Sequence, residues 1–287
     1  MRLRASSLDM LFTCPPSVLN PDGVHRVAQT SQSAKLGRAV HYMLGGMLLG
    51  EWSIDSLARY GLSVKAHEAE AQLLMHNGRV AWDALSPHCP EPQVEVEVNS
   101  TIPLEGGGDA QLTGTVDALS WSESNKAVII DWKTGYLDYG HAEQLTGYAY
   151  MVWDAMGQPA DAKITTIPVY LRNNYYVVTH HKPYDLNQWR RDLAHNVLAA
   201  PKTYCPGDHC RYCELYLYCP ARREASRSIM EEAIGKGDKK VSALIDGIYR
   251  SDSAEDIMAA TRDLWSRAAL AEKMAQDIKD ALRQTAR

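Results

Sequence analysis

Residues 114–148 constrain the fold of this 287-residue chain more than any other stretch. Apolar residues recur through 111–121 as they do in a strand, and the polar residues 122–125 that follow are typical of a turn. Residues 127–130 are apolar at consecutive positions, as expected of a strand that is buried on both faces. The sequence therefore predicts two paired strands joined by a short polar turn.

Each of these strands carries one carboxylate, Asp117 on the first and Asp131 on the second. Lys133 follows Asp131 by two positions, and the two-residue period of a strand places both on the same face. A pair of carboxylates is what Mg²⁺ takes from a protein when phosphates and water complete its coordination. A neighbouring lysine orients an attacking water or neutralises charge on a phosphate. The alternative is an ordinary hairpin whose charges face solvent and pair across the strands.

Together with their neighbours, these residues resemble the RecB-like branch of the PD-(D/E)XK nuclease superfamily. The motifs that carry the resemblance are Gly114-Thr115-Val116-Asp117, Asp131-Trp132-Lys133-Thr134-Gly135, Gln144 with Tyr148, and His41 in Gly37-Arg38-Ala39-Val40-His41. The resemblance covers residues 1–222. It implies an α/β fold with a restriction-endonuclease-like core. A mixed central sheet, flanked by helices, would carry the two acids at its open edge.

The resemblance also implies a site for Mg²⁺ or Mn²⁺. The implied metal ligands are His41, Asp117, Asp131 and the backbone carbonyl of Trp132, and the implied catalytic residues are Asp117, Asp131, Lys133, Gln144 and Tyr148. An imidazole ligand favours manganese as well as magnesium. Gln144 and Tyr148 share one face of a helix predicted over 141–156, where the family uses them to position the nucleic acid. Without the resemblance, they are a simple side-chain pair, and a lone helical histidine is a surface or core residue.

Six cysteines in a chain expected in the cytosol indicate metal binding or catalysis rather than disulfides. Cys210, Cys213 and Cys219 have the spacing C-x2-C-x5-C. It resembles the iron-sulfur signature of RecB-like nucleases, including AddB and the nucleases of CRISPR adaptation, whose fourth ligand is an N-terminal cysteine, here Cys14. The resemblance implies a [4Fe-4S] cluster that joins the N- and C-terminal parts of the domain. The alternative is a local site with Cys205 in place of Cys14, holding zinc or an iron-sulfur cluster.

Periodicity predicts the remaining elements. Helices are predicted near 33–50, 53–60, 64–85 and 185–199, and strands near 93–100, 163–171 and 175–180. Ser6 is predicted to cap a short first helix with Asp9 three residues on, and prolines 15–16 to stop it. Glu95 and Glu97 are interpreted as solvent-facing, and a supplementary role at the metal site is the alternative.

Two segments are expected: a nuclease domain over 1–222 and a helical extension over 223–287. The extension packs on the same domain or serves self-association or a protein partner. A net charge of -5 gives no global nucleic-acid signature, although a local basic path suffices for binding. The sequence has no long apolar run and no signal-peptide core, so we expect a cytoplasmic protein without a membrane partner.

The resemblance implies a divalent-metal-dependent deoxyribonuclease, most typically an exonuclease on DNA ends or single strands in recombination, repair or phage DNA processing. No serine or cysteine nucleophile lies beside a positioned base, which disfavours acyl transfer. The lack of a Walker loop disfavours an ATP motor in this chain. The alternative is a catalytically weak DNA-binding or adaptor module, stabilised by cysteine-bound zinc or an iron-sulfur cluster.

Overall fold

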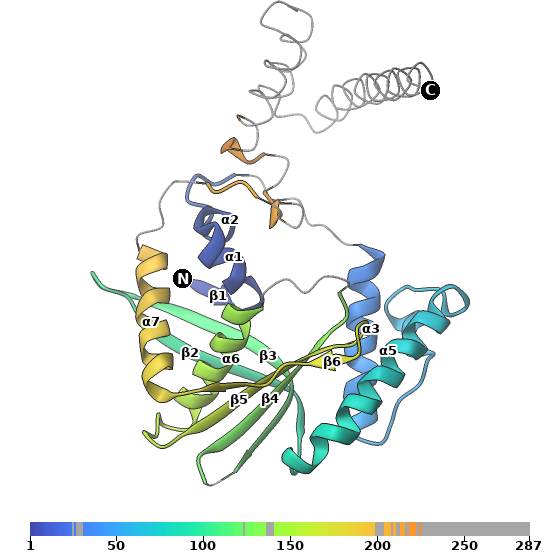
Figure 1. The fold of residues 1–287 in the computed structure, drawn as a ribbon. Coiled ribbons are helices and arrows are strands. Elements are labelled where there is room, and N and C mark those ends of the chain that lie inside the picture. Colours follow the sequence, from blue (N-terminus) through green and yellow to red (C-terminus); the bar gives the residue numbers. More distant parts are fainter. Residues whose placement is uncertain are drawn as a thin grey trace, which may run out of the picture. The chain divides into compact units, whose positions relative to one another are not determined.

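Figure 1 shows the chain in a computed structural model. The structure describes residues 1–24, 26, 31–122, 124–135, 141–198, 204–207, 209–210, 213–215, 218–221 and 224. The chain divides into two compact units, Met1–Tyr216 and Leu217–Arg287. The fold below is that of the first unit. The helices and partner contacts predicted for the C-terminal extension lie outside the described residues.

A mixed sheet forms the centre of this unit (Figure 1). Within the described residues, its strands run in the order β1-β3-β4-β5-β6, with β2 paired to β3 and β7 paired to β5. The strands are β1 (Arg2–Arg4), β2 (Gln93–Pro103), β3 (Asp109–Ser122), β4 (Lys126–Lys133), β5 (Lys163–Tyr170), β6 (Tyr175–Tyr176) and β7 (Thr179–His181). Antiparallel β3–β4 and parallel β4–β5 pairing make the sheet mixed. This sheet and its flanking helices have the α/β architecture predicted from the sequence.

Helices cover both faces of the sheet. They are α1 (Leu8–Thr13), α2 (Pro15–Leu19), α3 (Gln32–Leu48), α4 (Ser56–Arg59), α5 (Val64–Leu85), α6 (Ala142–Ala155) and α7 (Pro183–Leu198). One core cluster joins α1, α6 and α7 to the sheet. The other joins α3, α4 and α5 to the opposite face. Because side chains alternate along a strand, β4 contributes to both clusters.

The side chains of β4 show on which face of the sheet the predicted site residue Asp131 lies. Ala127 and Ile129 belong to the cluster with α6, whereas Ile130 and Trp132 belong to the cluster with α3 and α5. Asp131 shares the parity of Ile129, so its side chain lies on the α6 face. The consecutive apolar residues of β4 are therefore explained by burial between two layers of helices.

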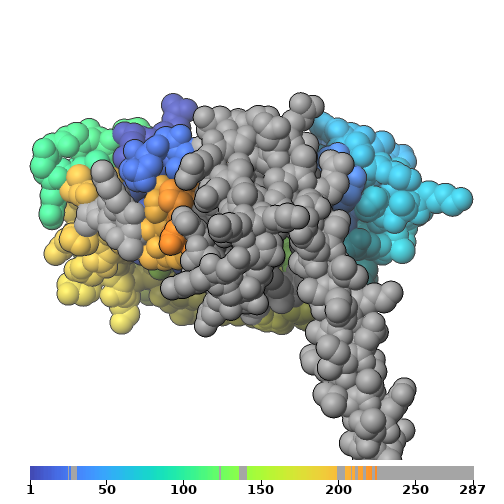
Figure 2. Space-filling model, turned by 90° about the horizontal axis from the view of Figure 1, so that it is seen from above, coloured from blue at the N-terminus to red at the C-terminus, as the bar shows by residue number. Residues whose placement is uncertain are grey.

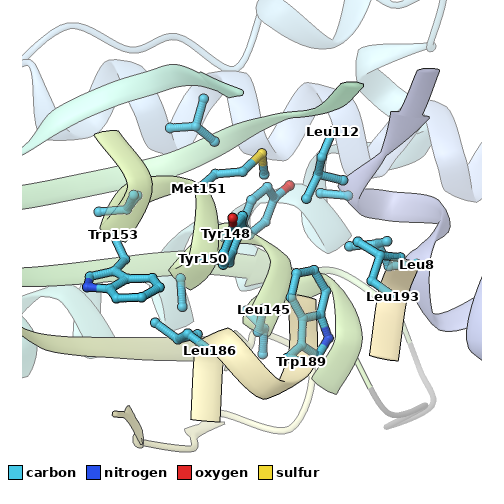
Figure 3. Close-up of a cluster of buried hydrophobic side chains, with 14 of the residues drawn as sticks. Leu8, Leu112, Leu145, Tyr148, Tyr150, Met151, Trp153, Leu186, Trp189 and Leu193 are labelled. Atoms are coloured by element: carbon cyan, nitrogen blue, oxygen red, sulfur yellow. The ribbon is translucent and has the colours of Figure 1, made fainter. Parts of the chain in front are cut away.

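The core beneath α6 is rich in aromatic rings (Figure 3). Tyr148, Tyr150 and Trp153 come from α6, and Trp189 comes from α7. The ring centroids of Tyr150 and Trp189 lie 5.8 Å apart. Each such ring removes about 150–250 Å² of surface from water, so α6 is held firmly against the sheet.

The N-terminal segment differs from the prediction in three respects. Residues Arg2–Arg4 form a short strand parallel to β3, which is too short to show a period in the sequence. Ser6 lies in a 3-10 turn, Ala5–Ser7, and does not cap α1. Helix α1 ends before prolines 15 and 16, as predicted, but the prolines also begin a second helix, α2, which was not predicted, because proline fits the first turn of a helix.

The other predicted helices and strands form, with two differences. The helix expected over 53–60 is shortened to α4, and the strand expected over 175–180 is divided into β6 and β7. None of the described helices combines the length and the apolar character needed to cross a membrane.

Candidate active site

The two predicted acids lie on neighbouring inner strands, where the pairing of β3 with β4 ends. Ala118 and Ile130 are the last paired residues, and Asp117 and Asp131 come next on their strands. There the backbone N–H of Trp132 donates to Oδ2 of Asp117 at 2.7 Å. The acids therefore lie where two central strands separate, and the expectation that they lie at an open edge of the sheet is wrong.

A chain of polar contacts joins β4 to α6. Nζ of Lys133 lies 2.6 Å from Oδ2 of Asp131 and donates to Oε1 of Gln144 at 2.8 Å. Nε2 of Gln144 donates to the Tyr148 hydroxyl at 3.1 Å and lies 3.5 Å from Oδ1 of Asp131. Asp131, Gln144 and Tyr148 are all buried. The structure thus brings together the predicted strand residues and the predicted helix pair.

His41 approaches Asp117 from α3, on the other face of the sheet. Its Nδ1 lies 3.0 Å from Oδ1 of Asp117. Burial lowers the pKa of His41, but the charge and hydrogen bond of Asp117 outweigh it, so the pKa lies above its ordinary value. Helix α3 comes this close because residue 37 is glycine: a Cβ on Gly37 would lie 2.8 Å from Oγ1 of Thr134.

The donor atoms of this site fit a hard divalent cation. Burial raises the pKa of the Asp131 carboxyl, although the Lys133 ammonium opposes this effect. Oδ2 of Asp131 is buried, and the Lys133 ammonium lies 2.6 Å from it in an ion pair. A carboxylate oxygen of this kind is a ligand type that Mg²⁺ or Mn²⁺ takes, and Asp117 and the imidazole of His41 offer such ligand types as well.

The site residues contact one another and do not converge on a single point. Among the described residues, no three or more histidine, cysteine, aspartate or glutamate side chains are grouped so as to hold a metal ion. Asp117 instead contacts His41, and Asp131 contacts Lys133. Metal binding would therefore exchange these internal pairs for bonds to the ion, as is common where carboxylates compete for a cation.

A pocket of about 510 Å³ opens beside His41 and Asp117, and Glu95 also lines it. Glu95 lies opposite Asp117 between two paired positions of β2 and β3, and its backbone is left-handed, with φ of 52°. Few non-glycine residues adopt this conformation. Partial burial and the charge of Asp117 raise the pKa of Glu95. The interpretation of Glu95 as merely solvent-facing was incomplete, because this exposed residue borders the site.

Arg172 was missed in the sequence. It follows β5, and its Nε donates to the backbone carbonyl of Thr134 at 2.6 Å, while its other end forms an ion pair with Glu70 of α5. Thr134 directly follows Lys133, so Arg172 fixes the end of β4 to the α5 layer. An arginine next to a buried strand was a visible signal, but its partner lies 102 residues away.

Two further residues fix α6 against the sheet. The carboxylate of Asp9 accepts the backbone N–H groups of Glu143 at 3.1 Å and Gln144 at 3.3 Å, and so caps α6 instead of its own helix. A Cβ on Gly114 would lie 2.6 Å from Cε1 of Tyr148. Gly114 on β3 therefore leaves the space that the Tyr148 ring from α6 occupies.

Replacement of Asp9 by alanine is expected to lower the free energy of unfolding by about 1 kcal/mol, because α6 loses its N-terminal cap. Asp9→Asn keeps one of the two oxygens that accept these N–H groups, so its loss should be smaller. Urea denaturation of the two variants and the wild type measures the difference. Equal destabilisation by asparagine and alanine would show that the charge, not the cap, matters.

Cys14 lies beside the cysteine-rich segment of the first unit. The backbone N–H of Cys205 donates to Sγ of Cys14 at 3.4 Å, and that of Gly207 donates to Sγ of Cys210 at 3.3 Å. Cys14 and Cys213 are buried, whereas Cys205 is exposed. Donors to sulfur stabilise thiolates and tune the clusters that thiolates hold. Cys219 belongs to the second unit.

Polar contacts on either side support this approach of distant segments. The Tyr204 hydroxyl donates to Oδ2 of Asp22 at 2.9 Å, and Arg26 forms an ion pair with Glu214 at 3.2 Å. Figure 2 shows atoms coloured orange beside atoms coloured blue on the face in view. Within the first unit, the N-terminal residues 14–26 and residues 204–214 are therefore adjacent.

A carboxylate pair, a lysine on the second strand and a mixed sheet between helices define the fold and site of a metal-dependent nuclease. The sequence profile of the PD-(D/E)XK nuclease superfamily matches residues 6–220, a range that includes every predicted site residue. The chain belongs to the PD-(D/E)XK nuclease superfamily.

Comparison with solved structures finds a weaker likeness. A structure titled "Crystal structure of SSO0001" aligns over 75% of this chain and 97% of its own, with 17% identity and a TM-score of 0.35. A comparison with curated proteins gives no match.

Proposed function

We propose that this chain is a divalent-metal-dependent deoxyribonuclease of the RecB-like, AddB-like iron-sulfur branch. It acts as an exonuclease on DNA ends or single strands, in recombination, repair or phage DNA processing. The observation that carries the proposal is the position of Lys133. Its ammonium is held between Asp131 and Gln144, on the strand next to the one that carries Asp117.

Each residue of the site has a defined task in hydrolysis. His41, Asp117, Asp131 and the carbonyl of Trp132 would hold Mg²⁺ or Mn²⁺, which supplies Lewis-acid activation of water and phosphate. Lys133 orients the attacking water or stabilises negative charge on the phosphate, because two acceptors fix its ammonium in place. Gln144 forms hydrogen bonds with both Lys133 and Tyr148. Gln144 and Tyr148 would help to place the scissile strand of the DNA.

The cysteines have a structural task in this proposal. Cys14, Cys210, Cys213 and Cys219 would hold a [4Fe-4S] cluster that links the N-terminal helices to the cysteine-rich segment. The donor chemistry supports it: sulfur atoms of Cys14 and Cys210 already accept backbone N–H groups. Thiolates with such donors suit iron-sulfur clusters.

The decisive experiment compares the wild type with Asp131→Asn on end-labelled single- and double-stranded DNA, in Mg²⁺ and in Mn²⁺. The wild type should release short products progressively from one end, and Asp131→Asn should cleave nothing above background. Glu97→Gln, an exposed acid on β2, is the matched control and should cleave as the wild type does. A pure, folded wild type that binds DNA but cleaves none with either metal would favour a binding module instead.

A further inference from the structure

One wall of the pocket beside the active site consists of residues that hydrolysis does not require. Tyr42 and Arg38 come from α3, and Tyr60 directly follows α4. The ring centroids of Tyr42 and Tyr60 lie 6.2 Å apart, with 57° between their planes. The guanidinium of Arg59 lies over the Tyr42 ring, 4.7 Å from its centroid. Tyr42 is 44% exposed, a large aromatic surface left open to solvent.

Arg38 in the pocket lining and Arg59 over Tyr42 are exposed cations. Neither Arg38 nor Arg59 forms an ion pair with any residue in the described ranges. By contrast, Arg79 on α5 pairs with Asp83 at 3.5 Å. Arginines beside an exposed ring such as Tyr42 are typical of surfaces that bind phosphate and a π-system together.

This combination matches the chemistry of an unpaired nucleotide. Bases of any identity stack on tyrosine rings, and arginine contacts the phosphate between two nucleotides. A base inside a duplex is stacked on its neighbours, so only an unpaired base can offer its face to the rings. The pocket also contains His41 and Asp117, so the bound nucleotide lies next to the reacting phosphate.

We propose that Tyr42 and Tyr60 form a stacking platform for the base of an unpaired nucleotide in single-stranded DNA, and that Arg38 holds its phosphate. The proposal rests on the proposed nuclease function, and it names the residues that give that activity its preference for single strands. The platform places the nucleotide flanking the scissile bond, so it acts on binding and positioning and not on the bond itself.

The first test measures binding of a fluorescent oligothymidine to the full chain by anisotropy, with Ca²⁺ present to allow binding without turnover. Tyr42→Ala should weaken binding by roughly 5- to 50-fold, as expected for the loss of one stacked base. Tyr42→Phe keeps the ring and should bind as the wild type does. Tyr184→Ala removes an exposed ring on α7, outside the pocket, and is the matched control.

The role of Arg38 is tested separately, through the salt dependence of DNA binding. Arg38→Ala should reduce the slope of log K against log salt by about 0.7, the value for one phosphate contact to a single strand. Arg79→Ala, which removes an exposed arginine on α5, should leave the slope unchanged. This test is independent of Tyr60, which packs partly in the core and is less suited to truncation.

A substrate change separates stacking from general loss of affinity. With an oligonucleotide whose end positions lack bases, the wild type should lose the same factor in binding that Tyr42→Ala loses with normal DNA. The variant should then be insensitive to the missing bases. Equal binding by the wild type and Tyr42→Ala, together with an unchanged Arg38→Ala slope, would overturn the platform.

The platform and the nuclease activity can fail separately. If the wild type cleaves DNA and Asp131→Asn does not, but Tyr42→Ala keeps the wild-type KM, the nuclease stands and the platform is wrong. If Tyr42→Ala loses binding but the wild type cleaves no DNA with either metal, the platform stands and the proposed hydrolysis is wrong. In the expected result, Tyr42→Ala raises KM for single strands and leaves kcat nearly unchanged.

Discussion

Lys133→Met is expected to reduce the rate of DNA cleavage by about 10²- to 10³-fold, a typical cost for one preorganised charge at a transition state. Methionine has a similar length and no charge, so the packing beside Gln144 is largely kept. The loss should appear in kcat, because the proposed role of Lys133 is at the reacting phosphate or water and not along the rest of the DNA strand. Single-turnover cleavage at saturating enzyme measures this rate directly.

The matched control for this experiment lies on the same strand. Lys126 begins β4, is exposed and is far from the acids along the strand, so Lys126→Met makes the same chemical change outside the site. It should cleave at the wild-type rate. A Lys133→Met protein that also cleaves at the wild-type rate would remove lysine from the proposed chemistry, even if Asp131→Asn is inactive.

Lys133→Met should also change how stability depends on pH. Burial already raises the pKa of Asp131 above its ordinary value, and losing the ammonium should raise it further. A folded carboxyl with a raised pKa binds more protons than its unfolded form, so the free energy of unfolding falls as pH rises from the unfolded pKa through the folded one. In metal-free buffer, the variant should therefore be penalised more at about pH 8 than at about pH 4.

The sequence predicted contacts within the candidate site well where the residues are close together in the chain. Asp131 and Lys133 are two positions apart on one strand, and Gln144 and Tyr148 are four apart on one helix. Each pair obeys the period of its own element, and in the structure each pair is in contact. That the two pairs would meet at the Lys133–Gln144 contact followed from the family resemblance, and no periodicity could have indicated it.

Periodicity could not predict contacts between residues that are far apart in the chain. Asp9 looked like a capping residue of its own helix, but its carboxylate serves α6, 134 residues later in the chain. Glu95 looked solvent-facing because it alternates with valines, and only its left-handed backbone and its place opposite Asp117 show that it borders the pocket. Tertiary packing decides which of several possible partners a polar side chain takes.

Cys14→Ala is expected to remove the brown absorption of the proposed iron-sulfur cluster and to lower the melting temperature by roughly 10–20 °C. The reason is the length of chain that the cluster would close. Cys14 and Cys210 are separated by about 200 residues, and a link across such a loop is worth about 5 kcal/mol in the chain-entropy account. For a domain of this size, 1 kcal/mol corresponds to about 2–4 °C.

Cys89→Ala separates the loss of a ligand from the loss of a buried sulfur. Cys14 and Cys89 are both free and buried, so alanine leaves a cavity of similar size at either site. Burial raises the pKa of the Cys89 thiol to about 11, which makes it a poor source of the thiolate that a metal needs. Cys89→Ala should therefore stay brown and lose only the stability that a buried cavity costs. The difference in melting temperature between Cys14→Ala and Cys89→Ala then measures the stabilisation due to the proposed cluster.

The outcome for Cys205 then decides between the two ligand sets. If Cys14 is a ligand, Cys205→Ala should stay brown, because the exposed Cys205 contributes its backbone N–H to Cys14 and alanine keeps that N–H. If Cys205→Ala turns colourless while Cys14→Ala stays brown, the site is local to the cysteine-rich segment. In that case the N-terminal helices are held there by polar contacts such as Tyr204 with Asp22, and Cys14→Ala should melt close to Cys89→Ala.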